Sequence, residues 1–388
     1  SASRWFNLSS WRSWRLGSSL IMKINAALLI QPQTPFVIEQ LTLDEPRTGE
    51  VLVKIVACGV CHSDWHLVTG ATKHPLPVVA GHEGAGVVHA VGQGVTHVKA
   101  GDHVVLNWSP ACGDCFYCQH GKPNLCDTFV GPIWQGVMLD GTPRLHRADG
   151  SPVYHYCGLA SFAEYAVVPQ ESCIPIRKDV PLEVASLVGC AVATGVGAAM
   201  YTAGVRPGES VVVYGAGGIG LSVLQGALLC GASTIIAVDT NATKMQLARD
   251  FGATHALMAN DDTLPSIREL TGGRGADHVF EAVGVPAVQE TALEAVRPGG
   301  TLTLVGLSAM GTGTNLPGAV IVRQEKVIKG SYYGSVDARR DFPLFIDLYV
   351  AGKLQLDKLV SKHYRLDQIN EAYEAMLGGE IARGVIGF

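Results

Sequence analysis

The sequence lacks the features that mark nucleic-acid-binding, membrane and repeat proteins. Basic residues are not in excess: 29 Lys and Arg against 34 Asp and Glu give a net charge of −5, so no electrostatic reason favours a nucleic-acid partner. The longest apolar stretch, residues 184–200, is broken by glycines and a threonine and is short for a bilayer span. No internal repeat of solenoid period is present. We therefore expect no nucleic-acid and no membrane partner, and we interpret residues 184–200 as a buried helix.

Acidic residues are missing before Glu39, and residues 1–21 differ from the rest in composition. They contain three Trp, three Arg and many Ser, and Arg- and Ser-rich segments without acids can be organelle transit peptides. We favour the alternative of a leader or tag, because Met22 followed by KINAALL resembles a natural start. Residues 1–21 are excluded from the fold prediction.

The chain is long and apolar enough for two domains with sizeable cores. It has 388 residues, of which 47% are hydrophobic and 16% are charged. Its ten cysteines are partly clustered, which in a long α/β chain suggests metal ligands rather than disulfides. We therefore expect a reducing compartment, the cytoplasm.

Secondary-structure patterns divide the chain into three parts. Residues 22–190 contain short β segments separated by Pro, Gly and Asp, which predicts a partly open β-barrel; residues 51–57 alternate, so one face of that strand is expected to be wet. Residues 191–333 alternate buried strands with helices, which predicts a doubly wound parallel sheet covered on both faces. Residues 334–388 are too few for a domain of their own and are expected to return to the first. The predicted class is α/β with a β-rich lobe.

A glycine-rich turn, G215-A-G-G-I-G220, follows the apolar strand SVVVY and opens a helix. This context predicts a dinucleotide site: Gly215 allows the tight turn, Gly217 lets the backbone approach a diphosphate, and Gly220 lets helix and strand pack closely. Gly218 and Ile219 lie at the helix start, whose free N–H groups favour phosphates. Asp239, at the end of the next strand, would accept hydrogen bonds from ribose hydroxyls and repel a 2′-phosphate, so NAD is favoured over NADP. The alternative is a glycine turn without a ligand.

Four cysteines within fifteen residues predict a structural metal site. The spacing C112-G-D-C115-F-Y-C118, followed by Cys126, allows one loop to wrap a tetrahedral zinc with no open position. An iron–sulfur cluster is the chemical alternative, and the β-rich surroundings favour zinc.

A second candidate metal site lies in the stretch from Gly59 to Glu83, where Cys61 and His82 are typical zinc ligands on separate turns. A catalytic zinc needs a third protein ligand and one open position. Cys190 fits, because it lies where the β pattern gives way to alternating strands and helices.

These motifs occur in an order that resembles the zinc-dependent medium-chain alcohol dehydrogenases over essentially residues 22–388. The resemblance implies a GroES-like catalytic domain, a Rossmann domain and two zinc ions per subunit. By it, Ser63 takes the substrate proton and His66 passes it to solvent, Asp64 orients the histidine ligand, and Glu83 lies close behind the metal.

The resemblance also assigns cofactor and substrate positions. It implies cofactor contacts by His62, Thr194, Lys244 and Arg383. The pocket positions that it implies are Thr72, Trp108, Tyr156 and Leu307. Trp108 is bulky and suggests an apolar slot for primary, allylic or benzylic alcohols and their aldehydes. NAD would accept the hydride from the alcohol.

Two other functions stay open at this point. One is a thiol-adduct (formaldehyde) dehydrogenase of the same family, although the segment DTFVGP after Cys126 and Thr72 lack the Arg and the acid that the glutathione-using members carry. The other is a non-catalytic nucleotide-binding protein on this fold. The long loop 127–162 resembles members that are often dimers, and an edge strand such as residues 301–307 could pair across a twofold axis. A homodimer is expected and a tetramer is the alternative.

Overall fold

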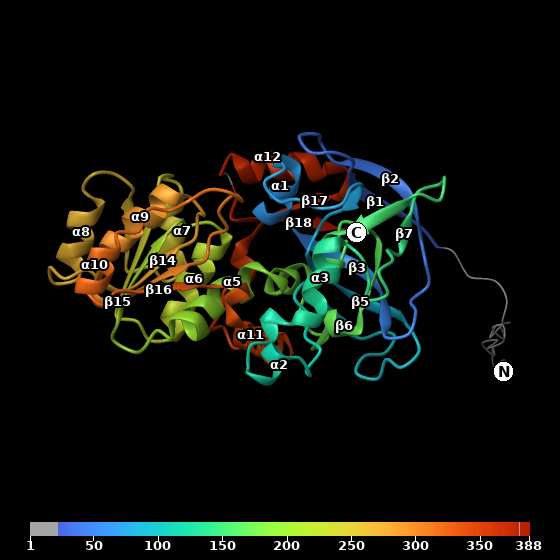
Figure 1. The fold of residues 1–388 in the computed structure, drawn as a ribbon, viewed down its shortest axis with the longest axis horizontal. Helices are drawn as coiled ribbons and strands as arrows, with labels where there is room; N and C mark the ends of the chain where they lie inside the picture. The colour runs from blue at the N-terminus through green and yellow to red at the C-terminus, as the bar shows by residue number, and fades with distance from the viewer. Residues whose placement is uncertain (1–21, 380) are drawn as a thin grey trace, which may run out of the picture.

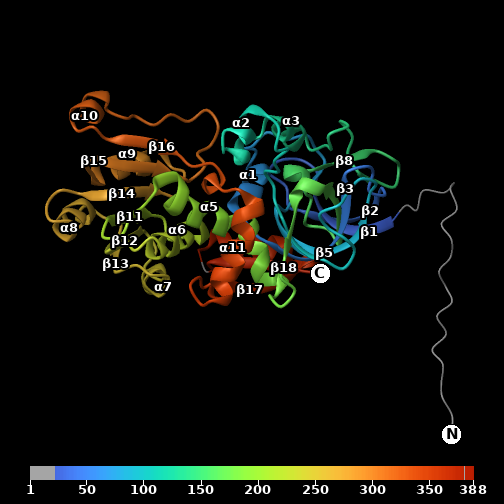
Figure 2. The same ribbon diagram turned by 90° about the horizontal axis from the view of Figure 1, so that it is seen from below.

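The computed structural model describes residues 22–379 and 381–388, so the prediction for residues 1–21 lies outside the described part. Two bodies lie end to end along the long axis (Figures 1 and 2). One is built around a parallel sheet and the other around a barrel and a mixed sheet. Helices α5 (Ala191–Gly197) and α11 (Ala338–Val350) lie between them. The expected fold class is confirmed.

The first body contains a ring of five strands: β1 (Met22–Leu29), β2 (Val37–Leu43), β7 (Leu145–His146), β8 (Pro152–His155) and β4 (Val78–Val79). The ring closes because β1 pairs with both β2 and β4, whereas the sequence predicted a partly open barrel. Strands β7 and β8 lie inside the segment expected to be a long loop. They are short, so their alternation is too brief to be recognised in the sequence.

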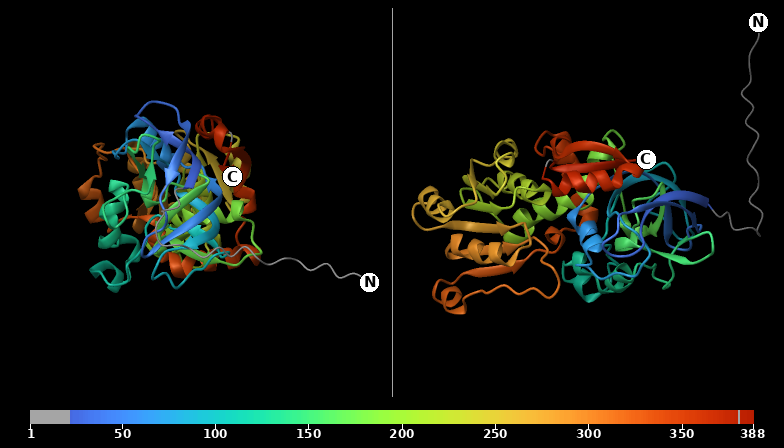
Figure 3. Two further views of the ribbon diagram at one scale, coloured as in Figure 1. Left: turned by 90° about the vertical axis from the view of Figure 1, so that its right-hand side faces the viewer. Right: turned by 90° about the horizontal axis from the view of Figure 1, so that it is seen from above.

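A seven-stranded sheet packs beside the barrel: β10 (Cys173–Ile176), β6 (His103–Leu106), β5 (Glu83–Val91), β3 (Glu50–Gly59), β18 (Arg383–Gly387), β17 (Val360–Arg365) and β9 (Tyr165–Pro169). The expectation of a wet face on β3 is confirmed only in part: Lys54 is exposed and Val56 is half-buried, but the rest of that face is buried because β3 lies inside the sheet. β18 pairs with β3, so the C-terminal segment returns to the first body (Figure 3). The domain boundaries at residues 190 and 333 stay predictions.

Short helices complete this body: α1 (His62–Thr69), α2 (Phe116–Gln119), α3 (Asp127–Gln135), α4 (Leu182–Ala185) and α12 (Ile369–Leu377). Helix α1 matters most for the site. It begins shortly after β3 and is capped by Gly70, whose φ of 78° is the left-handed conformation that glycine adopts without strain.

The second body is a six-stranded parallel sheet in the order β13 (His255–Met258), β12 (Thr234–Asp239), β11 (Ser210–Tyr214), β14 (Ala276–Glu281), β15 (Val296–Leu304) and β16 (Val327–Gly330). Helices α6 (Gly218–Leu229), α7 (Lys244–Asp250), α8 (Thr263–Leu270), α9 (Pro286–Ala295) and α10 (Gly318–Arg323) accompany it. Val211 and Val213 of β11 join the core shared with the first body, while Val212 faces a second core under α8 and α9. Both faces are therefore buried, which explains the near-continuous apolar strands.

Residues 301–307 do not form an edge strand, and that prediction is wrong. β15 pairs with β14 on one side and with β16 on the other. The last strand on this side of the described sheet is β16, which is short and lies directly before the return crossover.

Within residues 22–379 and 381–388, no single helix meets the length and hydropathy needed to cross a membrane. The segments Leu182–Gly189 and Ala191–Ala203 meet it only as a pair, and they are bent by 53°. Nearly all of their residues are buried, as predicted, but residues 184–200 do not form one helix, because the chain breaks at Cys190.

Candidate active site and metal centres

Three separate elements bring the predicted catalytic ligands together. Cys61 is the residue before α1, His82 lies directly before β5, and Cys190 is the residue before α5. Ligand atoms of these three side chains and of Glu83 all lie within 4.8 Å of one another, and all four residues are buried. Two thiols, an imidazole and a carboxylate in such a cluster form a donor set that suits zinc.

Asp64 orients the histidine of this cluster. Its Oδ1 accepts the backbone N–H of Gly81 at 2.8 Å and lies 3.1 Å from Nδ1 of His82. A proton on Nδ1 leaves Nε2 as the free lone pair of the ring. Asp64 therefore has the geometry of the carboxylate behind a metal-binding histidine.

The electrostatics of the cluster favour a bound cation. A hydrogen bond from Cys190 lowers the pKa of Cys61 well below its ordinary value against the effect of burial, and the charge of Arg383 adds to this. Burial alone would lower the pKa of His82, but Asp64 and the two thiols outweigh it and raise that pKa well above its ordinary value. The donors thus attract positive charge, and the residues present fit a zinc ion.

Glu83 and Arg383 lie on the side of the cluster that faces the second body. Burial raises the pKa of Glu83 to about 7, although the nearby guanidinium of Arg383 opposes this. Arg383 lies 3.5 Å from Oε1 of Glu83 and donates to the carbonyl of Val60 at 3.0 Å. A Cβ at Gly218 would lie 2.3 Å from Nε of Arg383, so this side chain reaches from the metal cluster to the start of α6, where a phosphate contact was predicted.

The proposed proton path lies along α1. Oγ of Ser63 is 3.7 Å from Sγ of Cys61, and the carbonyl of Ser63 accepts the hydroxyl of Tyr156 at 3.1 Å. His66 lies three residues further, on the same side of the helix, and is half-buried. The cluster, Ser63 and His66 therefore form one sequence of groups from the interior towards solvent.

Aromatic rings surround the histidine ligand. Trp108 and Tyr156 both meet His82 edge-on, with ring centroids 6.5 and 5.7 Å apart. Tyr332 meets Trp108 edge-on at 5.2 Å, and Trp134 meets Tyr156 at 6.4 Å. The sequence interpretation missed Tyr332 and Trp134, because they come from distant segments that only the fold brings together.

Two predicted pocket positions lie apart from these rings. Leu307, in the loop after β15, has 58% of its surface exposed and has no described ring contact. Thr72 lies just beyond α1, where its N–H donates to the carbonyl of His66 at 3.0 Å. Their assignment to the pocket stays a prediction.

The glycine turn has the geometry that a diphosphate requires. Gly215 has φ of 95°, and a Cβ at Gly220 would lie 1.7 Å from the carbonyl oxygen of Gly215. Nothing lies within 4 Å of a Cβ position at Gly217, so the turn is open on that side. Ile219, half-buried, follows in the first turn of α6, whose N-terminus points its free N–H groups into this space.

Asp239 ends β12 beside the turn. Its Oδ2 accepts the N–H of Ala216 at 2.7 Å, and Nζ of Lys244 lies 3.5 Å from the same oxygen. Thr194 is buried in α5 next to the cysteine ligand segment, and His62 is exposed at the start of α1. These positions agree with a cofactor lying between the two bodies, and their contacts with it stay predictions.

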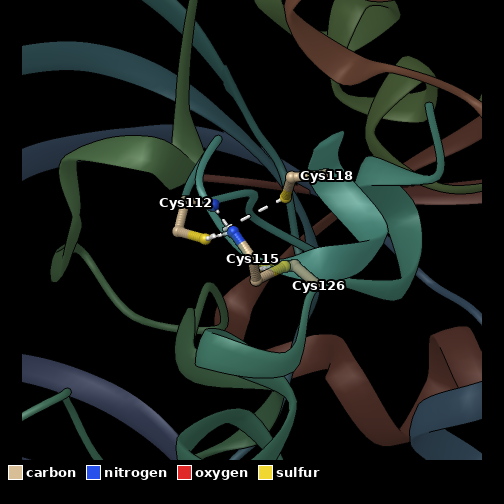
Figure 4. A group of neighbouring side chains, drawn as sticks. All are labelled: Cys112, Cys115, Cys118 and Cys126. Carbon is tan, nitrogen blue, oxygen red and sulfur yellow. Dashed lines mark hydrogen bonds between the residues drawn. The ribbon is translucent and has the colours of Figure 1, made fainter. Parts of the chain in front are cut away.

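The second cysteine cluster is a closed set of four thiols (Figure 4). Sγ atoms of Cys112, Cys115, Cys118 and Cys126 all lie within 4.8 Å of one another. Backbone N–H groups of Asp114 and Cys115 donate to Sγ of Cys112, at 3.4 and 3.3 Å. A hydrogen bond from Thr128 lowers the pKa of Cys112 to about 6. Four thiolates around one point, with no histidine or carboxylate, fit a structural zinc site.

Comparison with known proteins agrees with both parts of the fold. An alcohol dehydrogenase GroES-like domain profile matches residues 47–178, and a zinc-binding dehydrogenase profile matches residues 218–351. An NDMA-dependent alcohol dehydrogenase from Amycolatopsis methanolica is 45% identical over 94% of this chain and 99% of its own length. An S-(hydroxymethyl)glutathione dehydrogenase from Photobacterium damsela subsp. piscicida is 41% identical over 94% of this chain and 100% of its own.

A solved structure extends the likeness to three dimensions. The crystal structure of benzyl alcohol dehydrogenase from Acinetobacter calcoaceticus superposes with a TM-score of 0.90 at 34% identity and covers 95% of this chain and 99% of its own. Both profiles, these relatives and the two metal clusters show that the chain belongs to the zinc-dependent medium-chain alcohol dehydrogenase family and is an oxidoreductase.

Proposed function

We propose that the protein catalyses the reversible, NAD-linked oxidation of primary, allylic or benzylic alcohols to aldehydes. The observation that carries this proposal is the meeting of Cys61, His82 and Cys190 beneath a wall of aromatic rings. These three residues would hold a zinc ion and would leave one coordination position open, as a catalytic zinc requires. Glu83, the fourth member of the cluster, is paired with Arg383 and is kept close behind the metal in this proposal.

The residues around the cluster have separate tasks. When bound, zinc supplies a Lewis acid that can lower the pKa of a coordinated water from 15.7 to about 7. Oγ of Ser63 accepts the hydroxyl proton of the alcohol, and His66 passes it towards solvent. A hydrogen bond from Ser63 to a charged oxygen contributes only about 1.5–3 kcal/mol, so Ser63 serves mainly as the exit for the proton.

The substrate class rests on the aromatic rings. Trp108 and Tyr156 pack edge-on against His82, and Tyr332 and Trp134 extend this aromatic cluster. An aromatic lining favours planar, unsaturated substrates. The likeness to a benzyl alcohol dehydrogenase supports the same choice.

A panel of alcohols at saturating NAD tests the proposal. We expect kcat/KM for benzyl and allyl alcohols to exceed that for secondary alcohols and polyols of similar size, with two zinc ions per chain. A preference for secondary alcohols or polyols would contradict the substrate class. One zinc ion per chain would contradict one of the two metal sites.

Oxidation of a thiol adduct is the second candidate, because one relative is an S-(hydroxymethyl)glutathione dehydrogenase. The segment after Cys126, which forms α3, contains no Arg, and this argues against glutathione. S-(hydroxymethyl)glutathione belongs in the panel, and a kcat/KM above that for benzyl alcohol would select this candidate. The NDMA-dependent relative also makes the terminal electron acceptor worth measuring.

The proposed assembly is a homodimer, with a tetramer as the alternative. Strand β16 carries Val327, which is 42% exposed, and beside it Val322 of α10 is 77% exposed. An edge strand flanked by exposed apolar side chains can pair with a second copy across a twofold axis. Light scattering during gel filtration measures the mass, and a monomer at micromolar concentration would contradict the assignment.

A further inference from the structure

The crossover Ser331–Ser335 connects β16 of the second body with α11, which leads back to the first. Tyr333, Gly334 and Ser335 have φ of 55°, 65° and 56°. This left-handed conformation is sterically disfavoured for Tyr and Ser, and surrounding contacts must hold it. Tyr333 is only 3% exposed, so the crossover passes through the interior between the two bodies.

Tyr333 contacts the segment that carries a zinc ligand. Its hydroxyl donates a hydrogen bond to the carbonyl of Gly189, the residue directly before Cys190. Its ring lies against Trp108, with centroids 4.2 Å apart and planes tilted by 36°. One side chain therefore contacts both the backbone of the ligand segment and Trp108, a residue of the proposed substrate pocket.

Further contacts fix the crossover on three sides. A Cβ at Gly334 would lie 2.2 Å from the carbonyl oxygen of Ala193 in α5, so only glycine allows this approach. Oγ1 of Thr202 lies 3.0 Å from Oγ of Ser331 and 2.8 Å from Oγ of Ser335. Nδ2 of Asn124, two residues before Cys126, donates to the carbonyl of Tyr332 at 2.8 Å. The position of Tyr333 is thus set independently of Gly189.

We propose that Tyr333 is a positioning residue for the catalytic zinc site. Its hydroxyl holds the Gly189 carbonyl and thereby fixes the peptide that places Sγ of Cys190 beside Cys61 and His82. Because Tyr333 belongs to the crossover, this hydrogen bond also ties the ligand to the cofactor-binding body. The inference rests on the proposed function for the role of Cys190 as a zinc ligand.

Zinc release from the intact enzyme tests this role. Tyr333→Phe removes one hydroxyl and keeps the ring on Trp108. We expect a chromogenic chelator to withdraw the catalytic zinc roughly 2- to 10-fold faster from this variant, the factor that one neutral hydrogen bond provides. Release of the four-cysteine zinc should not change. Cys61→Ala, which is expected to keep only that structural zinc, identifies the two phases.

The matched control is Tyr364→Phe. Tyr364 is 4% exposed, and its hydroxyl has no hydrogen-bond partner in the part of the chain that the structure describes. This control should leave both release phases unchanged. Equal release rates for Tyr333→Phe and the wild type would overturn the inference, as would equal acceleration by the two variants.

A second measurement separates positioning from general loss of stability. With Co²⁺ at the catalytic site, Tyr333→Phe should shift the d–d absorption bands, since these report ligand geometry, while Tyr364→Phe should leave the bands unchanged. Unchanged bands would overturn the inference. Failure of the proposed function looks different, because the wild type itself would then release a single zinc.

Discussion

Asp239 should decide between NAD and NADP, and we expect this acid to have two tasks. The predicted one is to accept hydrogen bonds from the ribose hydroxyls; the observed one is to support the glycine turn, because its Oδ2 accepts the N–H of Ala216 at 2.7 Å. Its Oδ1 accepts the N–H of Asn241 at 2.9 Å. A change at this position should therefore alter both the predicted ribose site and the glycine turn predicted to hold the diphosphate.

The expected size of the NAD preference follows from the repulsion between the Asp239 carboxylate and the 2′-phosphate of NADP. A 2′-phosphate about 5 Å from the carboxylate is repelled by about 3 kcal/mol per unit charge at an effective dielectric constant of about 20. At 1.36 kcal/mol per factor of ten, this is roughly a 10²-fold preference for NAD. Lys244, 3.5 Å from Oδ2, offsets part of the repulsion.

The assay compares kcat/KM for NAD and NADP at a saturating alcohol concentration. Asp239→Ser combined with Thr240→Arg should reduce the ratio of kcat/KM for NAD to kcat/KM for NADP by at least tenfold. It should also lower kcat/KM for NAD, because Ala216 loses its acceptor. Thr240→Arg alone keeps the carboxylate and serves as the control. Equal use of both cofactors by the wild type would refute the reasoning.

Three further changes test other parts of the structure. Cys61→Ala should abolish turnover while NADH binding, followed by fluorescence, survives; a normal kcat would contradict the zinc site. Gly220→Ala places a methyl group 1.7 Å from the carbonyl oxygen of Gly215, so NADH affinity should fall at least tenfold, whereas an unchanged Kd would show that the turn is not the diphosphate site. Burial, followed by the charge of Arg144, lowers the pKa of His155 from 6.5 to about 3. The unfolded chain therefore binds a proton that the folded chain cannot, and the free energy of unfolding should decrease as pH drops from about 6.5 to about 3. Urea unfolding at pH 7 and 5 should show a smaller decrease for His155→Gln, and an equal decrease would count against this assignment.

Local patterns in the sequence were enough for much of the site. The glycine spacing from Gly215 to Gly220 and the four clustered cysteines each describe a single turn or loop, so their geometry follows from neighbouring residues. The contact between Asp64 and His82 follows only in part from neighbouring residues, because it also requires α1 to pack against the start of β5. β7 and β8 were missed because pairs of short strands depend on distant partners rather than on their own pattern.

Local patterns could not predict which strand lies at the edge of a sheet or which aromatic rings gather near His82. Residues 301–307 have the same apolar pattern whether their strand lies inside a sheet or at its edge, and the register with β16 decides which. Tyr332 and Trp134 are separated by about two hundred positions in the chain, and nothing local marks them as neighbours of Trp108 and Tyr156.

The sequence alone determined which atoms were available: thiols and an imidazole for two predicted zinc sites, and a glycine turn and a carboxylate for a predicted dinucleotide site. It did so because metal and phosphate chemistry restricts residue types and their local spacing. Tertiary structure alone decided where those atoms meet. It placed Cys190 beside Cys61 and His82, set Arg383 between Glu83 and Gly218, and brought Tyr333 onto the carbonyl of Gly189. These contacts join segments from the start, middle and end of the chain, and only packing of the two bodies specifies them.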